Sequence, residues 1–160
     1  MRITTTMKAL TLILCALLSA PSMAGQLAGK VIGISDGDTL KVLTSDRQQV
    51  KVRLSQIDAP ESTQAFGNRA KQELGRICFG KSAVLDVEGE DRYGRTIARV
   101  SCAGVDAQSH MVQAGMAWVY DRYVTDKSLY QLQQQAKNAR RGVWSDLKAI
   151  APWEFRQASR

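Results

Sequence analysis

The stretch "LAGKVIGISDGDTLKVLT", residues 27–44, does most to set the fold of the chain. Its two apolar ends flank Asp36-Gly37, a pair typical of hairpin turns because Gly tolerates positive φ and Asp bonds its own backbone. The pattern predicts two antiparallel strands, residues 27–34 and 39–44. The turn does not explain Asp38, which opens the second strand, where Asp is normally depleted. Asp38 is therefore either a solvated strand end or half of a metal site.

Further strands follow outward from this hairpin. Apolar and polar residues alternate through residues 50–55, "VKVRLS", which predicts a strand with one buried face and puts Arg53 on its polar side. Two more strands are predicted at residues 82–88 and 96–102, joined by the polar turn "GEDRYGR".

Three helices are predicted, over residues 68–78, 105–114 and 127–141, with Asn68 as the N-cap of the first. The tail "VWSDLKAIAPWEFR" is expected to pack back on the domain, a loose end being the alternative. Five short antiparallel strands with a helix after the third predict an α+β fold: an OB-fold five-stranded Greek-key β-barrel with about three helices. Such barrels bind nucleic acids or sugars, but the fold alone proves no function.

Residues 1–24 read as a secretory signal peptide. Arg2 and Lys8 precede the apolar run, and small residues end the segment, which predicts cleavage after Ala24. An uncleaved anchor is the alternative. Cleavage would leave a secreted or periplasmic protein, residues 25–160, with no membrane attachment and enough residues for one core.

Net charge indicates the class of binding partner, and the cysteines bear on the redox state of the compartment. The formal net charge of +7 becomes +5 without Arg2 and Lys8, which indicates a polyanionic partner such as nucleic acid, a phospholipid surface or an acidic polysaccharide. The alternative is that the charge only keeps the protein soluble. Cys78 and Cys102 in an exported chain predict one disulfide, with two buried thiols as the alternative.

Three acidic residues and two arginines carry the candidate chemistry. Asp38, Asp58 and Glu61 lie at strand ends or turns, and hard oxygen donors of this kind favour calcium (Ca²⁺) or Mg²⁺, with Ca²⁺ preferred in an exported protein. Arg53 and Arg95 offer planar donor forks that suit phosphodiester oxygens. Taken alone, each of these residues can be explained without a catalytic role, as a solvated residue or a turn residue. Together they indicate phosphoryl transfer.

Three motifs in order, "DGDTLKV", "VRLSQIDAPE" and "DRYGRT", resemble the staphylococcal nuclease (thermonuclease) family. The resemblance covers roughly Leu27 to Trp144, and "GMAWVY" and "RGVWSD" fit the later segments of that family. It implies one OB-barrel domain over residues 25–160 and Ca²⁺-dependent endonuclease hydrolysis of DNA and RNA that leaves 3′-phosphate ends. A non-catalytic nucleic-acid-binding module on the same barrel is the alternative, and an exported structural adaptor is a third.

The resemblance also implies residue roles. Asp38 and Asp58 correspond to the metal-binding carboxylates, and the backbone carbonyl of Ala59 to a third ligand. Glu61 corresponds to the general base on the attacking water. The two phosphate-binding arginines correspond to Arg53 and Arg95.

Contacts to the nucleotide are less well matched. Tyr93 fits a position beside the bound nucleotide and Tyr123 approximately fits another, with an ordinary core or surface tyrosine as the alternative, and Arg92 is a further candidate contact. The loop after Glu61 is shorter than the lysine-rich loop of the staphylococcal enzyme. We expect DNA and RNA substrates, no stable protein partner and a monomer.

Overall fold

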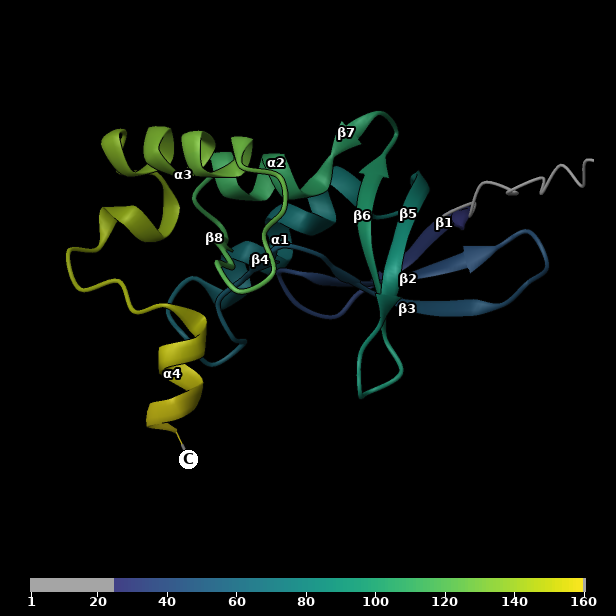
Figure 1. The fold of residues 1–160 in the computed structure, drawn as a ribbon, viewed down its shortest axis with the longest axis horizontal. Coiled ribbons are helices and arrows are strands. Elements are labelled where there is room, and N and C mark those ends of the chain that lie inside the picture. The colour runs from purple at the N-terminus through teal and green to yellow at the C-terminus, as the bar shows by residue number, and fades with distance from the viewer. Residues whose placement is uncertain (1–24, 160) are drawn as a thin grey trace, which may run out of the picture.

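The computed structural model describes residues 25–159, so the predicted signal peptide lies outside the described residues. The strands form a β-barrel on one side of the molecule, and the helices pack beside this barrel (Figure 1). The barrel strands are β1 (Gln26–Ile34), β2 (Thr39–Thr44), β3 (Gln49–Leu54), β5 (Ser82–Glu90) and β6 (Thr96–Cys102). The predicted α+β barrel is confirmed.

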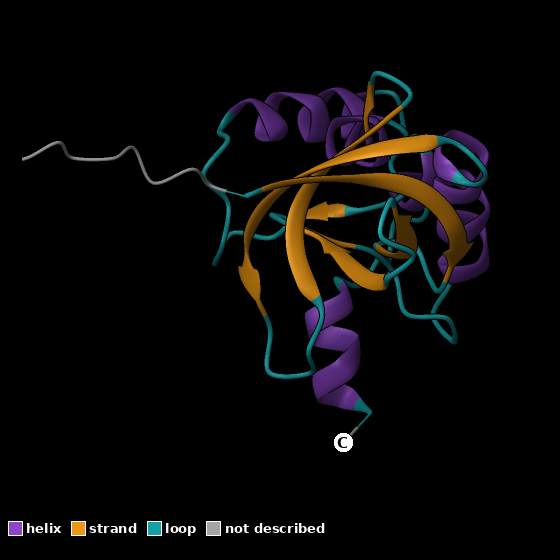
Figure 2. Cartoon of the chain, turned by 90° about the vertical axis from the view of Figure 1, so that its right-hand side faces the viewer, coloured by secondary structure: helices purple, strands orange, loops and turns teal. Residues whose placement is uncertain are grey.

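The barrel has the strand order β3-β2-β1-β5-β6 and is closed by a pairing between β3 and β6. That closing pair is parallel, with Val52 opposite Thr96, so the expectation of an all-antiparallel barrel is wrong at this seam. β1 pairs with both β2 and β5, and a register shift between Val31 and Gly33 bends it. Figure 2 shows the strands curving around one another as a result.

The remaining regular elements of residues 25–159 are helices and three strands of two residues each. The helices are α1 (Gly67–Cys78), α2 (Ala107–Gln113), α3 (Ser128–Asn138), η1 (Gly142–Ser145) and α4 (Pro152–Ala158), and the short strands are β4 (Ile57–Asp58), β7 (Val105–Asp106) and β8 (Trp118–Val119). The three predicted helices are present. The sequence did not reveal α4, which begins with a proline at its first turn.

Several predicted helix ends are wrong. Asn68 lies inside α1, whose N-cap is Phe66 in the left-handed region at φ 68°. β7 occupies the predicted start of α2, and Asp106 caps that helix by accepting a hydrogen bond from the Ser109 amide. α3 ends early because Arg140 takes a positive φ of 50° that a helix does not allow.

Buried aliphatic side chains from the barrel strands and α1 form the main core, among them Leu54, Leu74 and Leu85. The predicted disulfide between Cys78 and Cys102 joins the end of α1 to the end of β6. A second apolar cluster joins Trp118 to residues of the tail, which confirms that the tail packs back on the domain. Within residues 25–159, no helix is both long and apolar enough to cross a membrane.

Candidate active site

The loop between β1 and β2 carries Asp38 into the interior. Asp36 serves the turn as predicted, because its carboxylate accepts a hydrogen bond from the Asp38 amide at 3.1 Å. Gly37 is needed for a different reason from the one expected. Its φ is not positive, but a Cβ at this position would lie 2.6 Å from the Cβ of Ala70 and 2.8 Å from that of Ala59. Gly37 therefore lets the loop lie close against α1.

Asp38 is buried and held through both carboxylate oxygens, which rules out the solvated strand end. Oδ1 accepts the Thr39 hydroxyl at 3.0 Å, and Oδ2 accepts the Ala59 amide at 3.1 Å and Nη2 of Arg53 at 3.3 Å. The contact with Ala59 fixes the segment after β4 beside the β1–β2 loop. Two of the sequence motifs are thus in direct contact.

β4 places Asp58 next to Asp38. This strand pairs with β8. Gln56, the residue before β4, adopts a left-handed φ of 66°, and its side-chain oxygen accepts hydrogen bonds from the amides of Thr125 and Asp126. The Asp58 side chain is only 2% exposed, and its Oδ1 lies 2.9 Å from Nη2 of Arg53. One guanidinium nitrogen therefore joins the two aspartates.

Glu61 lies on the turn after Pro60, with its side chain 39% exposed. The first residue of α1, Gly67, lets this turn pack closely, since a Cβ there would lie 2.0 Å from the Glu61 carbonyl oxygen. The Glu61 amide donates to Oε1 of Gln64 at 3.2 Å. The base candidate is thus fixed through its backbone while its side chain remains accessible to water.

Arg156 of α4 completes the group and was not found by the sequence analysis. Its Nη1 lies 2.6 Å from Oε1 of Glu61, and its Nη2 lies 2.7 Å from Oδ2 of Asp58. We refer to Asp38, Asp58 and Glu61 as the carboxylate cluster. Two arginines, Arg53 and Arg156, neutralise part of its charge.

Burial shapes the electrostatics of this region. Burial, reinforced by the charge of Asp38, raises the pKa of Asp36 to about 6. Burial also raises the pKa of Asp58, although hydrogen bonds from Arg156 oppose that shift. The pKa of Arg156 is raised above its ordinary value mainly by its hydrogen bond to Asp58. The region is acidic and partly desolvated, and therefore attractive to cations.

Arg95 reaches the cluster only indirectly. It lies on the β5–β6 turn, where its Nε donates to Asp91 at 2.7 Å, and its Nη1 lies 3.5 Å from the Thr39 hydroxyl. That hydroxyl donates to Asp38, so Arg95 lies one residue away from the carboxylates. The turn and α4 lie at the same end of the barrel in Figures 1 and 2.

The candidate nucleotide contacts are exposed. Tyr93 is 68% exposed, with the guanidinium carbon of Arg92 4.8 Å from its ring centre. Tyr123 is 56% exposed, and its ring packs edge-on against Tyr120 at 5.1 Å. Both tyrosines therefore offer ring surface to solvent rather than to the core.

Among residues 25–159, no group of three or more His, Cys, Asp or Glu side chains is arranged to hold a metal ion. Asp38 and Asp58 nevertheless direct one oxygen each at the same Arg53 nitrogen, at 3.3 Å and 2.9 Å, so the two carboxylates already meet at a cation. The two carboxylates are hard oxygen donors, and Ala59 lies beside them with its amide directed at Asp38. This donor set fits Ca²⁺, which accepts water for its remaining ligands.

Comparison with known proteins places this geometry in context. A family model described as "Staphylococcal nuclease homologue" matches residues 51–146. The chain is 42% identical to "Micrococcal nuclease" of Shigella flexneri over 90% of this chain and 88% of that protein. It is 41% identical to "Protein ParB" of Escherichia coli over 91% and 88%, and 38% identical to an "Uncharacterized endonuclease" of Escherichia coli O157:H7 over 86% and 90%.

Proposed function

The chain belongs to the staphylococcal nuclease family, and on that premise we propose that it is an exported, calcium-dependent endonuclease acting on DNA and RNA and leaving 3′-phosphate ends. The observation that carries the proposal is the contact of Arg53 with both Asp38 and Asp58, beside the accessible Glu61. We infer from this arrangement a site for a cation, a carboxylate that can reach water and an arginine that can bind phosphate.

Asp38, Asp58 and the carbonyl of Ala59 are the residues that would hold the metal. When bound, Ca²⁺ would stabilise negative charge on a phosphoryl oxygen. Asp38 is fixed for this task by the Thr39 hydroxyl and the Ala59 amide, which leave it little freedom to rotate. Such partners of a ligand side chain orient it and support metal affinity.

Glu61 is assigned as the general base. Its partly exposed carboxylate can accept a proton from a water molecule as that water attacks the phosphorus atom in line with the leaving oxygen. The stiff Pro60 link separates it from Asp58, so the two carboxylates can serve water and metal respectively.

Arg53 and Arg95 are assigned to the phosphoryl oxygens, where negative charge grows as the 5′-oxygen leaves. Arg53 stands at the carboxylate cluster, while Arg95 approaches it from the β5–β6 turn past Thr39. The exposed Tyr93 and Tyr123 are proposed to stack on bases, with Arg92 contacting the nucleic acid beside Tyr93.

Export and assembly complete the proposal. The disulfide between Cys78 and Cys102 agrees with an oxidising compartment, as the predicted signal peptide requires. We propose a monomer whose single domain spans residues 25–160, without a stable protein partner.

Cleavage assays test the function. Residues 25–160 are purified and incubated with single-stranded DNA, double-stranded DNA and RNA, in Ca²⁺ or in a calcium chelator, and the product ends are identified by labelling before and after phosphatase treatment. The proposal predicts internal cuts only with Ca²⁺ and products that carry 3′-phosphate. Binding without cutting under all conditions would instead identify a nucleic-acid-binding module.

A further inference from the structure

α4 brings one residue to the carboxylate cluster that the proposed chemistry leaves without a role. We propose that Arg156 is a positioning residue that holds the general base Glu61 in a fixed place relative to Asp58. The inference rests on the role proposed for Glu61 and adds to it a requirement for the C-terminal segment.

The side-chain contacts of Glu61 make it dependent on Arg156. In the part of the chain that the structure describes, the Glu61 carboxylate has one side-chain partner, Nη1 of Arg156 at 2.6 Å. The same guanidinium reaches Asp58, which is buried, through Nη2 at 2.7 Å. A planar guanidinium fixes the spacing of the groups it joins more strictly than an ammonium does. Arg156 therefore links a partly exposed carboxylate to a buried one.

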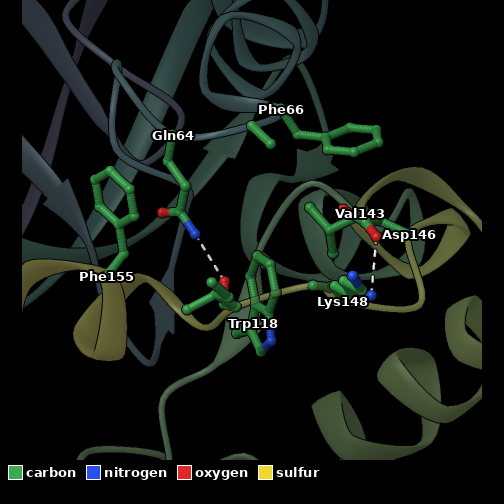
Figure 3. Close-up of a pocket in the computed structure, with 10 residues that line it drawn as sticks. Gln64, Phe66, Trp118, Val143, Asp146, Lys148 and Phe155 are labelled. Atoms are coloured by element: carbon green, nitrogen blue, oxygen red, sulfur yellow. Dashed lines mark hydrogen bonds between the residues drawn. The ribbon is translucent and has the colours of Figure 1, made fainter. Parts of the chain in front are cut away.

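A second contact ties the backbone of Glu61 to the same segment. Its amide donates to Oε1 of Gln64 at 3.2 Å, and Nε2 of that side chain donates to the Ile150 carbonyl at 2.7 Å (Figure 3). Glu61 is thus connected through both its amide and its carboxylate to residues 150–156. Two independent contacts to one segment indicate a built arrangement rather than a chance surface ion pair.

α4 also packs on the domain through apolar contacts. Trp153 stacks on Tyr120, with ring centres 5.4 Å apart and planes 7° apart, and Ala151 and Pro152 are buried. A cavity of about 170 Å³ lies beside the Gln64–Ile150 bond, with Phe66, Trp118 and Phe155 in its wall (Figure 3). α4, which begins shortly after Ile150, contributes Phe155 to the wall of that cavity. The polar contacts of Gln64 with Ile150 and of Arg156 with Glu61 add to this packing and hold residues 150–156 against the carboxylate cluster.

For catalysis, the proposed role of Arg156 is to orient the Glu61 carboxylate toward the attacking water. A general base acts only when it lies within hydrogen-bonding reach of the water it deprotonates. Without Arg156, the exposed Glu61 carboxylate can adopt other rotamers, and fewer enzyme–substrate complexes have the reactive geometry. Such a defect lowers kcat and leaves substrate binding nearly unchanged.

Kinetics of three variants test this directly. Arg156→Gln removes the charge and the fork, Arg156→Lys keeps the charge, and Arg140→Gln removes an exposed arginine elsewhere as the matched control. We expect Arg156→Gln to lower kcat about 10- to 100-fold with KM changed less than about threefold. Arg156→Lys should restore part of the rate, and Arg140→Gln should match the parent.

A double variant and hydrogen exchange separate positioning from general support of the fold. If Arg156 acts through Glu61, adding Arg156→Gln to Glu61→Gln lowers kcat no further, because the two effects are not additive. In calcium-free protein, Arg156→Gln should speed deuterium uptake in the peptide containing residues 61–66. Rates are compared at temperatures where circular dichroism shows each variant folded.

The outcomes are distinct. If Arg156→Gln cleaves at the parent rate while Glu61→Gln is slow, or if the two losses add fully, the positioning role is refuted and the proposed function stands. If Glu61→Gln cleaves at the parent rate, the proposed general base is refuted and the positioning role is refuted with it. Unchanged exchange at residues 61–66 would also overturn the inference.

Discussion

Arg53 and Arg95 have the same proposed role toward phosphate but different surroundings. Arg53 lies between the buried Asp38 and Asp58, whereas Arg95 pairs with Asp91 on a turn. The two residues should therefore contribute alike to catalysis and differently to stability, because Arg53 is the counter-charge of two more deeply buried carboxylates, whereas Arg95 pairs with one carboxylate that is 15% exposed.

Substitution of each arginine by glutamine tests this difference. Either change should lower kcat by about 100- to 1,000-fold, the usual cost of removing a donor to a developing charge. Arg53→Gln should also lower the free energy of unfolding by about 3 kcal/mol, and Arg95→Gln by about 1 kcal/mol or less. Urea denaturation followed by circular dichroism measures the second effect. Equal destabilisation by the two substitutions would contradict the burial argument.

Most residues of the candidate site could be named from the sequence, and the structure brings Asp38, Arg53, Asp58 and Glu61 together. They were identifiable because they occur in short motifs whose residue types suit one chemistry. Arg156 could not be found in this way, since it is 95 residues from Glu61 and no local pattern pairs them. A distant contact of this kind depends on where the whole tail packs.

At the scale of elements, alternation of apolar and polar residues predicted the strands well but not their partners. A period-two pattern shows which face is buried and does not show the direction of the neighbouring strand, so the parallel pairing of β3 and β6 was missed. α4 was missed because seven residues are too few for an isolated helix. It forms because Trp153 and Arg156 find partners in the rest of the fold.

The disulfide joins Cys78, at the end of α1, to Cys102, at the end of β6, and these two cysteines are 24 residues apart in the chain. Closing a loop of this length should stabilise the protein by about 3–4 kcal/mol through the entropy of the unfolded chain. We predict that the Cys78→Ala, Cys102→Ala double variant unfolds at a lower urea concentration than the parent by a corresponding amount. Midpoints that coincide would show that the bond contributes nothing to stability.

Asp126 links the start of α3 to β6, because it accepts hydrogen bonds from Ser128 and Arg99. We expect these contacts to make the stability of the protein depend on pH. Hydrogen bonds from Ser128, followed by those from Arg99, lower the pKa of Asp126 from 3.8 to about 2. A folded-state pKa below the unfolded value means that the ionised form is preferred in the native protein. Its stabilising contribution is therefore complete above about pH 4 and is lost as the pH falls through about 2.

Asp126→Asn is accordingly expected to lower Tm at pH 6, with the difference from the parent shrinking between pH 4 and pH 2. Thermal unfolding by circular dichroism across this range provides the measurement. Asp86→Asn, at an exposed position on β5, serves as the matched control. A difference in Tm between Asp126→Asn and the parent that stays constant down to pH 2 would contradict the assignment.

At the scale of the whole molecule, the positive charge should govern substrate binding. Residues 25–160 keep a formal charge of +5, because only Arg2 and Lys8 are removed from the total of +7. Binding of single-stranded DNA by the Glu61→Gln protein in chelator should weaken with salt, with a log–log slope of about −0.7 per phosphate contact. Arg92→Gln should reduce the magnitude of that slope by about 0.7. Fluorescence anisotropy measures it, and binding independent of salt would contradict this account.

The measurement that most directly tests the central claim is the single-turnover cleavage rate of Glu61→Gln at saturating Ca²⁺ and single-stranded DNA. The account predicts a rate at least about 100-fold below the parent, because the water loses its base. Ca²⁺ affinity, measured by calorimetry, should stay within a few-fold of the parent, since Asp38 and Asp58 remain in place. A rate within about threefold of the parent would contradict the account and remove Glu61 from the reaction.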